Sequence, residues 1–176
     1  MEKARIHIYC GDGKGKTTAA IGLSVRSCGR GWPVVLSQFL KGSTSGELNV
    51  LRSLPNYHYV EAPTTTCKFV FQMNEEEKTE YGQQVRQHFA DTVEAVKKYH
   101  AKLLVMDEVL DAVAMGMLSD EALADFLRNR PEDLEVVMTG RDPAPELTEL
   151  ADYVSEIRKV KHPFDRGIHA RKGIEF

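Results

Sequence analysis

The sequence predicts an α/β fold: a single domain over residues 1–176 in which helices cover both faces of a mostly parallel sheet. Short apolar stretches typical of strands alternate along the chain with longer stretches typical of helices. A glycine-rich loop joins the first predicted strand to the first predicted helix, which is the arrangement of a phosphate-binding α/β protein. The chain is long enough to bury one core.

The composition is that of an ordinary globular protein, with 42% hydrophobic and 28% charged residues. The formal net charge is -3 and the isoelectric point about 6.1, which disfavours a general nucleic-acid binder. The cysteines, Cys10, Cys28 and Cys67, form no Cys-x-x-Cys pair and suit a reducing compartment. The first residues lack the apolar core of a signal peptide, and no apolar run approaches the length of a membrane span. We therefore expect a cytoplasmic location and no membrane partner.

The predicted strands are short apolar runs, expected at residues 5–10, 33–40, 57–62, 102–108, 134–140 and 152–160. The predicted helices lie at residues 17–28, 46–54, 75–98, 119–128 and 145–151. The clearest helix start is Asn74, because Glu77 stands three residues later as in a capping box. Ligands of parallel α/β sheets bind beyond the carboxyl ends of the strands. That rule brings GDGKGKTT, the acids of VMDE and the segment TGR to one edge.

The loop GDGKGKTT predicts a nucleotide phosphate site. Its glycines allow successive backbone N–H groups to face an anion, and the helix that follows adds its own free N–H groups. Lys16 can reach phosphate oxygens, and Thr17 can offer a hydroxyl to a magnesium ion. Cys10 stands where the common pattern Gly-x-x-x-x-Gly-Lys-[Ser/Thr] has its first glycine, but that position ends the strand and lies outside the cradle. A glycine turn with solvated lysines is the alternative, and the flanking strand and helix argue against it.

Asp107 and Glu108 end the apolar run LLVM and resemble the second magnesium-binding motif of phosphate-loop proteins. Carboxylate oxygens suit a hard cation, so we predict a Mg²⁺ (or Mn²⁺) site formed by Thr17, Asp107 and Glu108. The alternative is a pair of acids at a helix N-terminus. The spacing does not decide which carboxylate contacts the ion.

Other candidate contacts are less specific. Arg141, in TGR, can reach the nucleotide or its leaving group, or form a salt bridge at the rim. Lys41 can contact the ligand or be solvated. Phe69 and Phe71 alternate on one side of an extended segment, and spacing alone favours two core aromatics. The basic tail over residues 158–172 can steer an anionic ligand or be a solvated surface.

Several motifs together resemble the P-loop ATP:corrinoid adenosyltransferase family. GDGKGKTTAA is similar to the phosphate loop of that family, which also lacks the first glycine. QFLKG, VMDE, TGR and VKHPFDRGIHARKGIEF are similar to its other motifs, in the same order, and the resemblance covers essentially the whole chain. It implies a P-loop NTPase-like fold. The implied nucleotide-binding residues are Gly11, Asp12, Gly13, Lys14, Gly15, Lys16, Thr17, Thr18, Lys41 and Arg141.

The resemblance implies an enzyme in which the cobalt of a reduced corrinoid attacks the 5′-carbon of ATP and inorganic triphosphate leaves. ATP is then a co-substrate and the corrinoid the acceptor, in adenosylcobalamin biosynthesis or salvage. Lys16, Thr17 and Glu108 would act on the leaving group. Phe69 and Phe71 match the aromatic pair that crowds the lower face of the corrinoid in this family, where Phe-x-Trp or a similar pattern occurs. The family also implies a homodimer and an electron donor such as a reduced flavoprotein.

Two other functions compete with this reading. A phosphate-loop ATPase or kinase of another substrate would release phosphate or ADP instead of triphosphate. A nucleotide- or corrinoid-binding regulator would keep the fold without turnover.

Overall fold

Six parallel strands form one sheet in the part of the chain that the computed structural model describes, residues 3–40, 45–62 and 73–175. The strand order is β3-β2-β4-β5-β1-β6. The strands are β1 (Ile6–Cys10), β2 (Val34–Gln38), β3 (Tyr57–Val60), β4 (Leu103–Asp107), β5 (Glu135–Thr139) and β6 (Tyr153–Glu156). Each neighbouring pair is parallel, so the predicted parallel sheet is confirmed.

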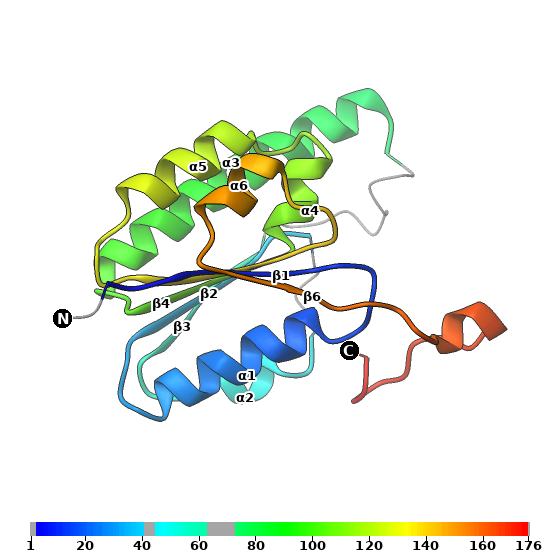
Figure 1. Cartoon of the computed structure of the whole chain (residues 1–176), viewed down its shortest axis with the longest axis horizontal. Helices are drawn as coiled ribbons and strands as arrows, with labels where there is room; N and C mark the ends of the chain where they lie inside the picture. The colour runs from blue at the N-terminus through cyan, green and yellow to red at the C-terminus, as the bar shows by residue number, and fades with distance from the viewer. Residues whose placement is uncertain (1–2, 41–44, 63–72, 176) are drawn as a thin grey trace.

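Helices cover both faces of the sheet, as predicted (Figure 1). One face carries α1 (Lys16–Cys28) and α2 (Leu48–Leu51), and the other carries α3 (Glu75–Lys98), α4 (Val109–Ala114), α5 (Asp120–Asn129) and α6 (Pro145–Leu150). Side chains of each strand alternate between the two layers: Val34 and Leu36 join the core under α1, whereas Val35 joins the core under α3 and α5. β2 and β4 are buried along their whole length, which explains the apolar runs VVL and LLVM with which they begin.

Local signals in the sequence place the long helix α3. Glu77 N donates to Asn74 Oδ1 and Asn74 N donates to Glu77 Oε2, both over 2.9 Å, so the predicted capping box is present. Three acids in the first turn and two lysines in the last turn match the helix dipole. None of the described helices is long and apolar enough to cross a membrane.

Two elements differ from the sequence prediction. The helix α4, only six residues long, begins directly after Glu108 and was not predicted. It is too short to show a helical period in its sequence, and no side chain caps its start. β6 is an edge strand whose residues are all exposed, and it ends four residues before the predicted bound at residue 160.

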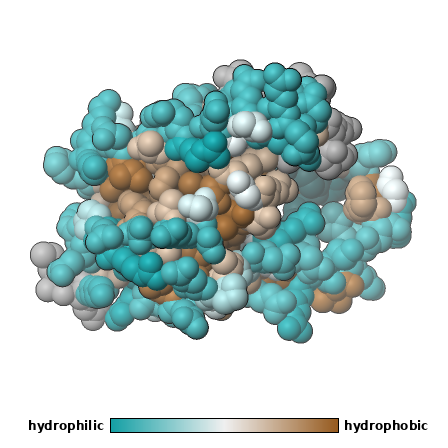
Figure 2. All heavy atoms as spheres, turned by 90° about the horizontal axis from the view of Figure 1, so that it is seen from above, coloured by the Kyte–Doolittle hydropathy of each residue, from teal (hydrophilic) through white to brown (hydrophobic). Residues whose placement is uncertain are grey.

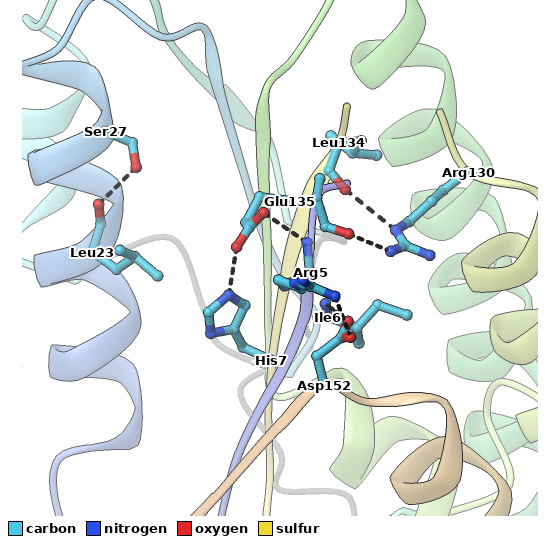
Figure 3. Close-up of polar contacts among 10 residues, drawn as sticks. Arg5, Ile6, His7, Leu23, Ser27, Arg130, Leu134, Glu135 and Asp152 are labelled. Atoms are coloured by element: carbon cyan, nitrogen blue, oxygen red, sulfur yellow. Dashed lines mark hydrogen bonds and ion pairs between the residues drawn. The ribbon is translucent and has the colours of Figure 1, made fainter. Parts of the chain in front are cut away.

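Hydrogen bonds join the amino ends of β1 and β5 and the start of β6, at the edge of the sheet opposite the phosphate loop (Figure 3). His7 Nε2 lies 2.7 Å from Glu135 Oε1, and Arg5 N donates to Glu135 Oε2 over 2.8 Å. Ile6 N donates to Asp152 Oδ2 over 2.9 Å. These contacts join β1 to β5 and to the start of β6, so we assign His7 a structural role.

The chain leaves the sheet after β6, forms the short helix η2 (Pro163–Arg166) and returns toward the start of α1 (Figure 1). Apolar side chains on this tail are open to solvent: Val160 is 89% and Phe164 73% exposed. Figure 2 shows apolar surface in the middle of the α3–α6 layer, framed by hydrophilic side chains, and again on the protruding tail. Polar contacts, described below, hold the tail end against the loop.

Candidate nucleotide and cation site

The carboxyl ends of β1, β2, β4 and β5 bring the predicted site residues to one edge of the sheet. The phosphate loop, residues 11–15, joins β1 to α1, while Gln38, Asp107 and Thr139 end the other three strands. The register pairs Gln38 with Asp107. The expected convergence of GDGKGKTT, VMDE and TGR at one edge is therefore confirmed.

The phosphate loop leaves no room for side chains at two of its glycines. Gly11 has a φ of +100°, and a Cβ there would lie 2.5 Å from Ile157 O. A Cβ on Gly13 would lie 2.7 Å from the same carbonyl oxygen, to which Gly13 N donates a hydrogen bond. Cys10 is the last residue of β1 and is buried, and burial raises the pKa of its thiol. The strand, not the cradle, contains this position, as predicted.

The Lys16 ammonium lies over the loop. Its Nζ donates to Gly11 O over 2.7 Å and to Gly13 O over 3.0 Å. The start of α1 has Gly15 as its N-cap and no side-chain cap, so its first N–H groups face the loop without an acid competing for them. Thr18 lies exposed in the first turn of this helix. The loop, the lysine and the helix start together form a cradle for phosphate oxygens.

Asp107 is the centre of the hydrogen-bond network at this edge, and it is fully buried. Thr17 Oγ1 donates to Asp107 Oδ1 over 2.9 Å, and Thr139 Oγ1 donates to the same oxygen over 2.7 Å. Asp107 Oδ2 accepts from Gln38 Nε2 over 3.1 Å. The carboxylate is thus linked to three elements, and Asp107 is the acid beside the Thr17 hydroxyl.

Glu108 has an uncommon backbone conformation, with φ 61° and ψ 16°. Its N–H donates to Thr139 Oγ1 over 2.8 Å, which fixes the turn between β4 and α4. Left-handed conformations at residues other than glycine are unfavourable and concentrate at functional sites. This turn keeps Glu108 at the strand end, next to Asp107.

The backbone of Arg141 joins the loop to α4. Arg141 N donates to Asp111 Oδ1, and Arg141 O accepts from Gly11 N, both over 3.0 Å. Burial raises the pKa of Asp111, and the hydrogen bond from Arg141 N partly opposes this rise. The Arg141 side chain is exposed at a hollow of about 600 Å³ that Asp12, Arg158 and Lys159 also line. A cation at this rim is open to an anionic ligand.

The C-terminal tail lies against the phosphate loop. Lys159 N donates to Asp12 Oδ1 over 2.9 Å, and this bond is the main cause of the lowered pKa of Asp12. Lys14 Nζ lies 2.7 Å from Glu175 Oε1. Hydrogen bonds from Arg171 and then from Lys14 lower the pKa of Glu175 to about 2. The tail therefore brings an acid as well as its basic residues to the loop.

Three candidate residues, Lys41, Phe69 and Phe71, lie outside the described residues, so their roles stay predictions. Sequence reasoning missed the contribution of Thr139, which contacts both Asp107 and the backbone of Glu108. The available signal was a hydroxyl residue at the carboxyl end of an apolar strand. The contact of Glu175 with the loop had no local signal.

The oxygen atoms of Thr17 and Asp107 suit a divalent cation whose other ligands are phosphate oxygens and water molecules. In the described ranges, no group of three or more His, Cys, Asp or Glu side chains could hold a metal ion. The arrangement fits Mg²⁺, which is usually bound through one or two carboxylates together with substrate phosphates.

Comparisons with known proteins show which family the sequence is similar to. The family model described as ATP:corrinoid adenosyltransferase BtuR/CobO/CobP matches residues 2–176. A corrinoid adenosyltransferase from Escherichia coli (strain K12) is 36% identical over 177 residues, which cover 99% of this chain and 87% of that protein. The corrinoid adenosyltransferase CobA of Salmonella typhimurium (strain LT2) is 36% identical over 181 residues, with the same coverage of 99% and 87%.

Among solved structures, the genome packaging NTPase B204 from Sulfolobus turreted icosahedral virus 2, in complex with ATP-gammaS, is similar at 17% identity and a TM-score of 0.46. The match covers 99% of this chain and 79% of that one.

Proposed function

This chain belongs to the ATP:corrinoid adenosyltransferase family, and on that premise we propose that it transfers the 5′-deoxyadenosyl group of ATP to the cobalt of a Co(I) corrinoid. The cobalt electron pair forms the new bond to the 5′-carbon. The bond from that carbon to oxygen breaks, and its electron pair leaves with inorganic triphosphate. The product belongs to adenosylcobalamin biosynthesis or salvage.

The single observation that carries this proposal is the pairing of a phosphate cradle with a buried carboxylate. Lys16 Nζ spans the loop carbonyls, and Thr17 Oγ1 donates to Asp107 Oδ1 at the same edge. Triphosphate is a good leaving group only when its growing negative charge is stabilised. We propose that loop N–H groups, Lys14, Lys16 and Arg141 supply that stabilisation, and we add Lys41 to this set from the family resemblance.

Thr17, Asp107 and Glu108 would hold Mg²⁺ or Mn²⁺, which when bound neutralises charge on the triphosphate. Of the two acids, Asp107 is the one we propose to act closest to Thr17, because their oxygen atoms lie 2.9 Å apart. Glu108 adds a second carboxylate from the adjacent turn.

The reaction needs no general base, because the cobalt nucleophile carries no proton. Two histidines near the sheet have hydrogen-bond partners within the fold. His7 lies in the network at the opposite strand ends, and His88 is 3% exposed with Nε2 2.7 Å from Ser37 Oγ.

Phe69 and Phe71 are proposed to crowd the lower face of the corrinoid, as the family resemblance implies. A homodimer, a reduced flavoprotein as electron donor and a cytoplasmic location are further proposals that rest on family membership.

The test is an anaerobic reaction of the protein with ATP, Mg²⁺ and chemically reduced Co(I) corrinoid, followed by visible spectroscopy. We expect a light-sensitive adenosylcorrinoid spectrum with the wild-type protein. Lys16→Ala should bind ATP far more weakly and slow this change. Tight binding of ATP or corrinoid by the wild-type protein without a spectral change would instead support a regulator.

A further inference from the structure

Gln38 is the last residue of β2 and is fully buried beside the proposed cation site. Its Nε2 donates to Asp107 Oδ2 over 3.1 Å. Its Oε1 is also buried, and none of the described residues donates a hydrogen bond to it. One half of the amide therefore has a defined role, and the other half is an acceptor without a donor among the described residues.

The orientation of this amide is fixed by its neighbour. A carboxylate only accepts hydrogen bonds, so exchanging the amide oxygen and nitrogen would place two acceptors against each other. Because Nε2 and Oε1 belong to one planar group, the unpartnered oxygen lies next to the Asp107 carboxylate. A buried acceptor without a donor is unfavourable, so its place at this edge calls for a functional reason.

The two other buried side-chain atoms without a partner in the described part of the chain are Tyr59 Oη and Gln84 Oε1. Tyr59 belongs to β3 and Gln84 to α3. Gln38 is thus distinguished by its direct bond to the proposed cation ligand.

We propose that Gln38 is a positioning residue for the divalent cation, an assignment that rests on the proposed function. Its Nε2 holds Asp107 so that Oδ1 stays beside Thr17, and its Oε1 accepts a hydrogen bond from a water molecule that the cation carries. Mg²⁺ in proteins usually keeps several water ligands. A hydrogen-bond acceptor next to the protein ligands can hold one of these water molecules in position.

A purely structural Gln38 would only tie β2 to β4. The two roles separate when metal affinity and ligand-free stability are measured on the same variants. Gln38→Leu removes both halves of the amide at similar size. Gln84→Leu is the matched control, because it removes the other buried amide oxygen without a partner, on α3.

The measurement is the binding of Mn²⁺ in the presence of ATP, by electron paramagnetic resonance, together with thermal melting without ligands. We expect Gln38→Leu to weaken Mn²⁺ binding by about 10- to 100-fold, as outer ligand partners usually do. Gln84→Leu should leave it unchanged. ATP binding in the absence of Mn²⁺ should be similar in both variants and the wild type.

Unchanged Mn²⁺ affinity in a folded Gln38→Leu variant, with only a lower melting temperature, overturns the proposal. If that variant does not fold, Gln38→Asn keeps the amide but shortens its reach, and the same loss of Mn²⁺ affinity is expected. Failure of the proposed function looks different: wild-type protein binds Mn²⁺ and ATP but makes no adenosylcorrinoid, while the effect of Gln38 on Mn²⁺ remains.

Discussion

Lys14 Nζ lies 2.7 Å from Glu175 Oε1, although the two residues are 161 positions apart in the chain. Arg171, in the same tail, also donates to Glu175. The Glu175 carboxylate therefore bonds to one tail residue and to one residue of the phosphate loop. The Glu175 carboxylate is therefore paired with the Lys14 ammonium group, which we propose contacts the triphosphate of bound ATP. Bound nucleotide and Glu175 would compete for the same ammonium group.

Glu175→Gln should therefore raise the affinity for ATP. The pair is exposed to solvent, so we expect a gain of roughly two- to fivefold, which shrinks as salt is added. Titration of ATP at low and high salt measures it. Glu94→Gln, which removes an exposed acid on α3, is the control. Equal affinities in the Glu175 variant and the wild type at low salt would show that no competition exists.

Thr17 offers a second test, because its hydroxyl bonds to Asp107 Oδ1. Thr17→Ala should raise the Mg²⁺ concentration needed for half-maximal adenosylation by about 10- to 100-fold. Thr17→Ser keeps a hydroxyl, so it should need a Mg²⁺ concentration close to that of the wild type. The rate of adenosylation as a function of Mg²⁺ concentration separates the two variants. Indistinguishable Mg²⁺ responses in the Ala and Ser variants would remove Thr17 from the cation site.

Gly13 and Gly22 make a matched pair for the packing of the loop. A Cβ on Gly13 would lie 2.7 Å from Ile157 O and 2.8 Å from Arg158 C, both backbone atoms that cannot easily move. Gly13→Ala should lower the melting temperature and the ATP affinity together. Gly22→Ala has open space around it in α1 and should stabilise the protein by roughly 0.5–1 kcal/mol. An unchanged melting temperature and ATP affinity in Gly13→Ala would show that the backbone at Ile157 and Arg158 can move to make room for the Cβ.

His88 makes stability depend on pH. Burial lowers its pKa from 6.5 to about 4, against a smaller opposing effect of Asp91. Between these two values the unfolded chain binds a proton that the folded protein does not. The stability is therefore fully present above about pH 6.5 and falls with decreasing pH, by about 2 kcal/mol at about pH 5.

Chemical denaturation at about pH 7 and about pH 5 measures this effect of His88. Glutamine at position 88 cannot titrate but can still bond to Ser37. In the His88→Gln variant, the loss of stability between the two pH values should therefore be smaller than in the wild type by about 2 kcal/mol. His169→Gln, at an exposed position in the tail, should retain the full loss. The account of His88 fails if both variants behave alike.

Much of the fold could be predicted because its signals are local. The strand predicted at residues 102–108 contains the apolar run LLVM, as a strand buried on both faces requires, and Asn74 with Glu77 marks the start of α3. The phosphate loop was also recognisable, since glycines between a strand and a helix are close together in the sequence. Such features need no knowledge of which strands become neighbours.

The remaining features depend on contacts between distant segments. Thr17 lies beside Asp107, and the turn after β4 places Glu108 in a left-handed conformation, bonded through its N–H to Thr139. The role of Gln38 follows from its register with Asp107 across β2 and β4. Neither the register nor the turn leaves a periodic pattern in the sequence.

The central claim is that this edge of the sheet stabilises triphosphate as a leaving group, and analysis of the phosphorus products tests it most directly. The protein would be incubated anaerobically with ATP, Mg²⁺ and Co(I) corrinoid, and the products followed by phosphorus NMR. Our account predicts inorganic triphosphate in an amount equal to the adenosylcorrinoid formed. ADP or inorganic phosphate, produced without adenosylcorrinoid, would contradict it and identify a phosphate-loop ATPase or kinase.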